Sequence, residues 1–381
     1  MGIAASSPVA EEVESAPEAG AEVVIIDFAD LEAGMDLTSK LAAAFCEGGL
    51  GLCAVRGVPG FAAARRRLLP LARTLARLPA EALEKYELPE TFYTTGWSRG
   101  REKFNGRPDL AKGSFYANPI FDDPANGDEE IRSKFPFAAS RNIWPQEVPD
   151  LEAAFKAMGN IIYEATKPVV QQCDRLVSSR CEGNAEVLYE KTFTGSRMVL
   201  GRLLHYYAGQ ADSWCGWHND NSVITGLVPG MWLNEETGEE TDVASSSSGL
   251  RVCGRDGAVV QVRLPGDCLG LQIGEAAQIL SGGVLRATPH FVQGHISRPG
   301  EVMVSRESFA LFMEPQWDSC IGPPKGASYE DVLRGEEVKL IPPLSKRLKP
   351  DPNTKQVEFG KLLGDSFTEY YKHNNPENVI S

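Results

Sequence analysis

The 381-residue sequence lacks several features that would assign it to a structural class at once. No apolar run approaches the roughly 20 residues that a membrane-spanning helix needs, and the eight cysteines include no C-x-x-C pair and no zinc-ribbon spacing. Positive charge is also scarce, since 38 Lys and Arg residues stand against 52 Asp and Glu residues, for a formal net charge of -14. We therefore expect no membrane span, no disulfide framework and no nucleic-acid partner, because nucleic-acid-binding surfaces concentrate cations.

The N-terminus resembles neither a secretory signal nor an arginine-rich transit peptide, because it is rich in small and acidic residues. A cytoplasmic location is the prediction. The opening Met1-Gly2-Ile3-Ala4-Ala5-Ser6 fits the short myristoylation pattern, which makes Gly2 a candidate acylation site, although no polybasic patch follows.

Composition and length favour a globular protein with one large domain and substantial additions, at 42% hydrophobic and 24% charged residues. Short apolar strands with turn signals between them run from residue 197 to Pro315, a pattern typical of an antiparallel barrel or jelly roll. We expect a disordered lead over 1–21, a mixed helical region over 22–195 that packs on the barrel, the barrel over 196–322, and a C-terminal extension over 323–381.

Outside the barrel, periodicity predicts several elements. Residues 61–88 show leucine periodicity broken at Pro70 and Pro79, and their arginines are predicted to form a solvated helix face. Residues 92–146 are aromatic and rich in turns, and periodicity leaves open whether they form a substrate-facing surface or a long excursion packed on the core. The other expected elements are strands at Val23–Phe28 and Gly51–Val55 and helices at Leu37–Phe45, Leu151–Leu176 and Val357–Tyr371.

Only five histidines occur in the chain, so their placement is informative. In Trp217-His218-Asn219-Asp220, the period of two of a strand would put the imidazole and the carboxylate on one face. A second histidine, His290, follows a turn at Ser281-Gly282-Gly283 and so lies near the start of a later strand. If that strand crosses the barrel, His218, Asp220 and His290 form a 2-His-1-carboxylate facial triad, whose open positions suit iron(II) and oxygen chemistry.

A third element is Arg306-Glu307-Ser308, which opens an apolar strand that ends at Pro315. Alternation puts Arg306 and Ser308 on one face, where a guanidinium and a hydroxyl can grip a carboxylate. Two interpretations remain open at this point. The arginine forms an internal ion pair with an Asp or Glu, or it binds a dicarboxylic co-substrate.

These residues together resemble a known family. Residues 203–315 resemble the catalytic barrel of the isopenicillin-N-synthase-like family of iron(II) and 2-oxoglutarate dioxygenases, in motif order and in most spacings. That family's H-T-D and the Leu-Thr after it match His218-Asn219-Asp220 and Ile224-Thr225. Its I-G-D matches Ile273-Gly274-Glu275, and its Ser-Asn-Gly turn matches Ser281-Gly282-Gly283. Its R-x-S matches Arg306-Glu307-Ser308, and its tyrosine upstream of the H-T-D matches Tyr207. The segments Gly113–Pro119 and Asn142–Pro145 resemble an uncharacterised plant and algal branch of the family.

The sequence also departs from that family's pattern. The family's His-Arg-Val at the distal ligand is His290-Phe291-Val292 here, and an insertion after Trp232 lengthens the gap between the ligand histidines. The connection from His290 to Arg306 is also longer than usual. None of these departures removes a predicted metal ligand. They therefore bear on which molecules can enter the barrel and not on whether a metal can bind.

The resemblance implies a mixed α and β fold with a double-stranded β-helix (jelly-roll) core and flanking helices. It implies a monomeric dioxygenase that uses Fe(II), 2-oxoglutarate and O2 to oxidise a small-molecule substrate. In that reading His218, Asp220 and His290 bind the metal, while Arg306, Ser308 and Tyr207 bind 2-oxoglutarate. His205 is either a core histidine or a support for the site. The alternatives are an iron-dependent oxidase of the same fold that does not use 2-oxoglutarate and a non-catalytic binding or scaffold protein.

Overall fold

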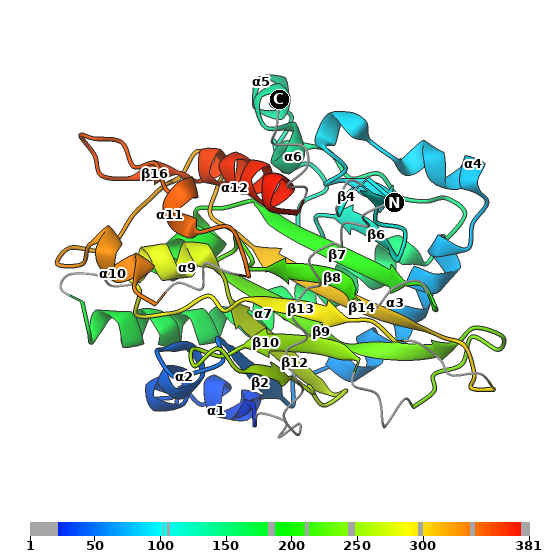
Figure 1. The fold of residues 1–381 in the computed structure, drawn as a ribbon, viewed down its shortest axis with the longest axis horizontal. Helices are drawn as coiled ribbons and strands as arrows, with labels where there is room; N and C mark the ends of the chain where they lie inside the picture. Colours follow the sequence, from blue (N-terminus) through cyan, green and yellow to red (C-terminus); the bar gives the residue numbers. More distant parts are fainter. Residues whose placement is uncertain are drawn as a thin grey trace, which may run out of the picture.

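Two facing β-sheets form the centre of the protein in the computed structural model (Figure 1). The structure describes residues 22–101, 103–104, 107–181, 187–209, 213–242, 248–295, 300–335 and 340–374. The larger sheet has the strand order β1-β2-β12-β9-β14-β7-β6-β3, and the smaller has the order β11-β10-β13-β8. All pairings in these two sheets are antiparallel except that of β1 with β2.

The strands from β7 to β14 lie within the expected run from residue 197 to Pro315, and β1 and β2 match the two strands expected before it, whereas β3 and β6 were not predicted. The larger sheet consists of β1 (Val24–Asp27), β2 (Leu52–Arg56), β3 (Gly96–Arg99), β6 (Lys112–Ala117), β7 (Val199–Tyr206), β9 (Ile224–Asn234), β12 (Cys268–Ile273) and β14 (Val304–Met313). The smaller sheet consists of β8 (Ser213–His218), β10 (Gly249–Cys253), β11 (Val259–Gln261) and β13 (His290–Gln293).

Two long helices, α3 (Phe61–Ala76) and α7 (Leu151–Ser178), pack against strands of the larger sheet. The predicted break at Pro70 is wrong, because α3 runs through it without interruption. A proline inside a helix costs about 3 kcal/mol, but the buried face of α3 includes Leu68, Leu69 and Leu75, and burying one such side chain gains about 1.5–3 kcal/mol. Apolar burial therefore outweighs the lost hydrogen bond.

The arginines of α3 do not form the uniformly solvated face that was predicted. Arg66 and Arg67 are exposed, but Arg65 is only 8% exposed and donates hydrogen bonds to the carbonyls of Pro229 and Gly230. Arg73 pairs with Glu235 just beyond β9. Two of the arginines thus attach α3 to the chain around β9.

The aromatic stretch 92–146 contributes to the core through Trp97 and Phe115, and other residues of the stretch line a cavity described below. Its strands β3 and β6 extend the larger sheet beyond β7. The short elements between β2 and α7 are α4 (Ala80–Leu83), the 3-10 turns Glu84–Tyr86 and Pro89–Thr91, β4 (Lys103–Phe104), β5 (Arg107–Pro108), α5 (Glu129–Lys134) and α6 (Pro136–Ala139).

The remaining helices lie near the two ends of the chain and between α7 and β7, except for α9, which connects β12 to β13. Helices α1 (Phe28–Glu32) and α2 (Thr38–Phe45) separate the first two strands. Helix α12 lies beside α11, above α9, in the upper left of Figure 1. The elements not yet named are α8 (Val187–Tyr189), a π-helical turn at Glu190–Thr194, α9 (Glu275–Leu280), β15 (Cys320–Ile321), α10 (Tyr329–Leu333), α11 (Leu344–Arg347), β16 (Val357–Glu358) and α12 (Phe359–Asn374).

Other expectations from composition can be checked within the described ranges. None of the described helices is both long and apolar enough to cross a membrane. None of the eight cysteines, all of which lie in the described ranges, forms a disulfide, and five of them are buried. Gly2, the candidate acylation site, lies outside the described residues.

Phe155 on α7 connects the helical layer to the barrel. Its side chain is 0% exposed and makes edge contacts with Phe115 of β6 and Phe309 of β14, at centroid distances of 5.9 and 4.9 Å. We predict that Phe155→Ala lowers the free energy of unfolding by about 3–5 kcal/mol, because it leaves a cavity in a packed core. Urea denaturation would measure this loss. Phe92→Ala is the control, since Phe92 is 69% exposed and its replacement should change stability by less than about 0.5 kcal/mol.

Candidate metal centre and adjoining cavities

Three predicted ligands converge at one end of the barrel. His218 ends β8 and His290 begins β13, and the antiparallel pairing of these strands places the two residues directly opposite each other. Their ring centroids are 4.2 Å apart. Asp220 reaches the same point from the loop that follows β8, so the expected strand alternation does not extend to it.

The ligand atoms have the separations that a shared cation needs. Asp220 Oδ1 lies 3.8 Å from His218 Nε2 and 3.7 Å from His290 Nε2, and the three ligand atoms lie within 4.8 Å of one another. Asp220 is 6% exposed, and its Oδ2 has no hydrogen-bond partner among the described residues. A buried carboxylate oxygen without a donor is costly, and a bound cation would satisfy it. The site thus fits a divalent metal ion.

The far nitrogen of each imidazole is held by the protein. His218 Nδ1 donates to the carbonyl of Gly216 at 2.8 Å, and His290 Nδ1 donates to that of Thr288 at 3.1 Å. Gln272, which is 0% exposed, has its side-chain amide 2.8 Å from His290 Nδ1, and a proton on Nδ1 requires the amide oxygen, which has no other partner among the described residues, to take this position and accept. With the proton on Nδ1, the lone pair of Nε2 is directed at the centre, as in supported histidine ligands.

The two histidines differ in their electrostatic surroundings. Burial, and then the neighbouring His218, lowers the pKa of His290 to about 4, so this imidazole is neutral at pH 7. Burial also opposes a charge on His218, but Cys215 and Asp220 outweigh it and raise the pKa of His218 to about 9. A bound metal would replace that proton, because only neutral imidazole is a ligand.

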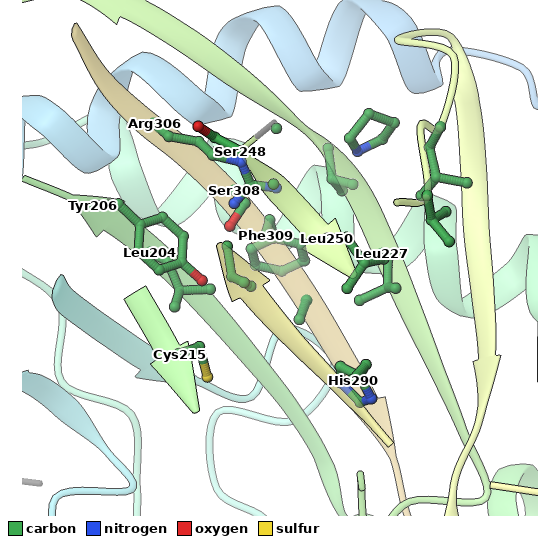
Figure 2. Close-up of a pocket in the computed structure, with 18 of the residues that line it drawn as sticks. Leu204, Tyr206, Cys215, Leu227, Ser248, Leu250, His290, Arg306, Ser308 and Phe309 are labelled. Carbon is green, nitrogen blue, oxygen red and sulfur yellow. The ribbon is translucent and has the colours of Figure 1, made fainter. Parts of the chain in front are cut away.

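A cavity of about 370 Å³ extends from the three ligands between the two sheets. Figure 2 shows His290 at one end and Arg306 and Ser308 toward the other, with Leu204, Leu227 and Leu250 among the apolar side chains around them. The lining is mixed, because polar side chains such as Arg202, Gln261 and Arg263 stand beside the apolar ones.

Arg306 has no carboxylate partner within the described ranges, so the interpretation as an internal ion pair receives no support there. Its guanidinium lies 5.3 Å from the ring of Tyr206. Gly230 makes room for it, because a Cβ at this position would lie 2.5 Å from Arg306 Nε. Burial lowers the pKa of Arg306 from its usual value. A cation enclosed in this way favours an anionic ligand.

Tyr207, which the resemblance assigns to co-substrate binding, does not line the cavity, whereas its neighbour Tyr206 does. Arg306 of β14 pairs directly with Tyr206 of β7, so Tyr206 shares its face and lines the cavity. Tyr207 points to the other side, where Arg99 stacks on its ring at 3.8 Å and its hydroxyl contacts the carbonyl of Ala76.

His205 belongs to the core on that same opposite face. Its Nδ1 lies 2.9 Å from Glu307 Oε1, and the two side chains are 2% and 0% exposed. Ser305 Oγ donates to the same carboxylate oxygen. Of the two interpretations of His205, the core histidine is therefore the one that the contacts favour.

A second, smaller cavity of about 220 Å³ adjoins the ligands from another side. His218 and Asp220 line both cavities, and so do Arg202 and Phe312. The rest of its wall comes from three separate regions, including Thr94, Tyr116, Asn118 and Asn142 before α7, Leu200 and Glu314 in the barrel, and Leu363 and Phe367 on α12. Burial and the nearby Asp220 raise the pKa of Glu314 to about 8.

Sequence reasoning missed Gln272, Gly230, Tyr206 and Glu314. Strand register identifies Tyr206, because it faces Arg306 only when β7 and β14 are aligned. Nothing in the sequence pointed to Gln272 or Gly230. Gln272 contacts His290 and Gly230 makes room for Arg306, and each of these neighbours lies on a different strand. Glu314 lies next to Pro315 at the end of the R-x-S strand, and that position was the one available hint.

Solved structures with this fold include several oxygenases. One, assigned to the 2OG-Fe(II) oxygenase family, is from Caulobacter crescentus; it has a TM-score of 0.64 and 19% identity, covering 91% of this chain and 98% of that chain. A full-length Neurospora crassa protein, solved in complex with alpha-KG, has a TM-score of 0.61 and 17% identity, covering 91% and 96%. The dioxygenase for auxin oxidation from rice has a TM-score of 0.52 and 19% identity, covering 80% and 87%.

These likenesses confirm the predicted double-stranded β-helix core with flanking helices. The chain thus has the fold of the 2OG-Fe(II) oxygenases. No protein-family profile and no curated protein sequence matches it.

His218→Ala and Asp220→Ala should each abolish specific binding of a divalent metal while leaving the fold intact. Each removes one of three ligands from a preformed face, so the loss should exceed the roughly 100-fold that follows removal of a supporting residue. Titration with Co(II), followed by its absorption, measures the affinity, and circular dichroism checks the fold. His373→Ala, which replaces an exposed histidine on α12, is the control. Wild-type affinity in either ligand variant would contradict the assignment.

Proposed function

We propose that this chain, which has the fold of the 2OG-Fe(II) oxygenases, is an iron(II)- and 2-oxoglutarate-dependent oxygenase that oxidises a small molecule. One observation supports this above all. A single cavity has two histidines and an aspartate at one end and, toward the other, an arginine without a carboxylate partner among the described residues. Figure 2 shows His290 and Arg306 at these two ends. A metal ion and a dianionic co-substrate would together satisfy both ends.

The donor set favours iron(II) as the metal. Two imidazoles and one carboxylate, with the remaining positions left open, are typical of non-haem iron(II) oxygenases, whereas four-ligand tetrahedral sets are typical of structural zinc. His218, Asp220 and His290 would hold the ion. When bound, iron(II) together with 2-oxoglutarate would supply the activation of dioxygen that oxidises the substrate.

Arg306, Ser308 and Tyr206 would hold the co-substrate. The guanidinium of Arg306 and the hydroxyl of Ser308 lie on the cavity face of β14, where they can donate charge-assisted hydrogen bonds to a carboxylate. Leu204, Leu227 and Phe309 add apolar surface to the cavity wall, which strengthens charge-assisted hydrogen bonds beside it.

The smaller cavity would receive the substrate, because it reaches His218 and Asp220 from a side that Arg306 does not line. Its volume of about 220 Å³ lies below the range of roughly 300–1,000 Å³ typical of pockets for drug-sized ligands. In this proposal residues 196–322 hold the metal and the co-substrate, while residues 22–195 and 323–381 shape the substrate end. The contribution of all three regions to the cavity wall supports that division.

The structural neighbours agree with the proposal. The Neurospora crassa protein was solved with alpha-KG, and JOX2, with a TM-score of 0.58 and 17% identity over 80% of this chain, was solved with 2OG, Fe and JA. Their ligands suggest which co-substrate to test first.

Arg306→Lys should weaken 2-oxoglutarate binding while metal binding survives. Lysine keeps the charge but loses the planar fork that grips both carboxylate oxygens. Loss of a charge-assisted contact costs about 1.5–3 kcal/mol, which corresponds to a roughly 10- to 100-fold higher dissociation constant. The metal-to-ligand absorption band of the iron-loaded protein without oxygen measures this affinity.

Arg99→Lys is the matched control, because Arg99 stacks on Tyr207 outside the cavity. Equal 2-oxoglutarate affinity in wild type and Arg306→Lys would withdraw the co-substrate assignment. An oxidase that does not use 2-oxoglutarate would reveal itself by forming no succinate when 2-oxoglutarate is supplied.

Leu200→Trp tests the substrate end separately. The larger side chain should fill much of the smaller cavity, since Leu200 lines it and does not line the larger one. We expect wild-type binding of Co(II) and 2-oxoglutarate, together with loss of the succinate formation that a small-molecule extract stimulates in wild type. Undiminished stimulation in Leu200→Trp would place the substrate elsewhere.

A further inference from the structure

Asn219, the residue between the two ligands His218 and Asp220, is held from outside the barrel. Its backbone N–H donates to the hydroxyl of Tyr370 on α12 at 2.9 Å. Its side-chain Nδ2 donates to Glu275 Oε1 on α9 at 3.0 Å. The segment that separates the ligands is therefore bonded through both its main chain and its side chain.

Glu275 is fixed in turn by a buried ion pair with Arg347 of α11. The guanidinium nitrogens lie 2.5 and 2.7 Å from the two carboxylate oxygens, and the residues are 1% and 0% exposed. Arg347 also donates to Ser366 Oγ of α12 and to the carbonyl of Pro342. A two-pronged pair of this kind defines direction as well as distance, so the position of Glu275 depends on the C-terminal segment.

The main chain of α9 adds a third connection to the metal ligands. The backbone N–H of Glu275 donates to the carbonyl of Asp220 at 2.8 Å. Gly274 allows this approach, because a Cβ there would lie 2.1 Å from the carbonyl oxygen of Ser222. The loop 219–222 is thus packed directly on the start of α9.

We propose that the C-terminal segment 344–374 is a part of the metal site, in which Tyr370 and the Arg347–Glu275 pair are positioning residues that set the spacing of His218 and Asp220 through Asn219. Tyr370 lines neither cavity. It therefore acts on the metal through Asn219 and not by touching substrate or co-substrate. Docking of α12 then determines how tightly the metal is held. The inference rests on the proposed function only in that a metal binds at the three ligands.

The test is Tyr370→Phe in the full-length protein, with Co(II) as the probe and no 2-oxoglutarate present. The substitution removes the oxygen that accepts from Asn219 N–H and retains the ring. Loss of a supporting contact typically lowers metal affinity about 10- to 100-fold, and we expect the lower end, about tenfold. The melting temperature of the metal-free protein reports on general stability.

Tyr329→Phe is the matched control, because Tyr329 also lies in the C-terminal extension and its hydroxyl also makes one hydrogen bond, to the carbonyl of Lys355 at 3.0 Å. We expect the two variants to melt at similar temperatures without metal, while only Tyr370→Phe loses Co(II) affinity. Release of Co(II) to a chelator should be faster in Tyr370→Phe alone.

Two results would overturn the inference and leave the proposed function standing. One is Co(II) affinity of Tyr370→Phe within twofold of wild type. The other is an equal loss of affinity in both tyrosine variants, which would indicate general loosening. Failure of wild type to bind Co(II), or binding that persists in His218→Ala, would overturn the metal site itself and both proposals with it.

Discussion

The antiparallel pairing of β8 with β13 is the constraint on which the rest of the site depends. It sets His218 opposite His290, and it works because both residues lie at strand ends, where the neighbouring loop can bring Asp220 to the same point. A shift of one residue in this register would turn one imidazole to the other face of the sheet. Main-chain hydrogen bonds, more than the ligands themselves, thus determine that three side chains meet.

The larger sheet supplies the second feature of the cavity, a guanidinium that no carboxylate of the described residues pairs with. Glu307, the acid next to Arg306 in the chain, faces the other side of β14 and is occupied by His205 and Ser305. This arrangement leaves Arg306 with Tyr206, Ser308 and the space above Gly230. A guanidinium in such surroundings is expensive unless an anion joins it, so this end of the cavity favours an anionic ligand.

The structure departs from the sequence interpretation at several places for one physical reason. Tyr207 and Tyr206 are adjacent, and only the alignment of β7 with β14 decides which of them faces the cavity. Arg65 belongs to a helix that looks solvated by its charge pattern, yet the carbonyls of a distant strand accept its hydrogen bonds. Pro70 should end a helix, but apolar contacts with the sheet outweigh the local preference. In each case a tertiary contact overrode a local rule.

The sequence by itself indicated the candidate metal ligands, the arginine of the R-x-S strand and the jelly-roll class, because these depend on residue type and chain order, although the period of two did not extend to Asp220. Scarce histidines and an arginine in an apolar strand are informative without coordinates. Only the tertiary structure decided that Asn219 is held by α12 and α9, that Gln272 supports His290, and that a second cavity draws its wall from three regions of the chain. These features join residues far apart in sequence. Their relative positions depend on how sheets and helices pack, and packing of this kind produces no periodic pattern in the sequence.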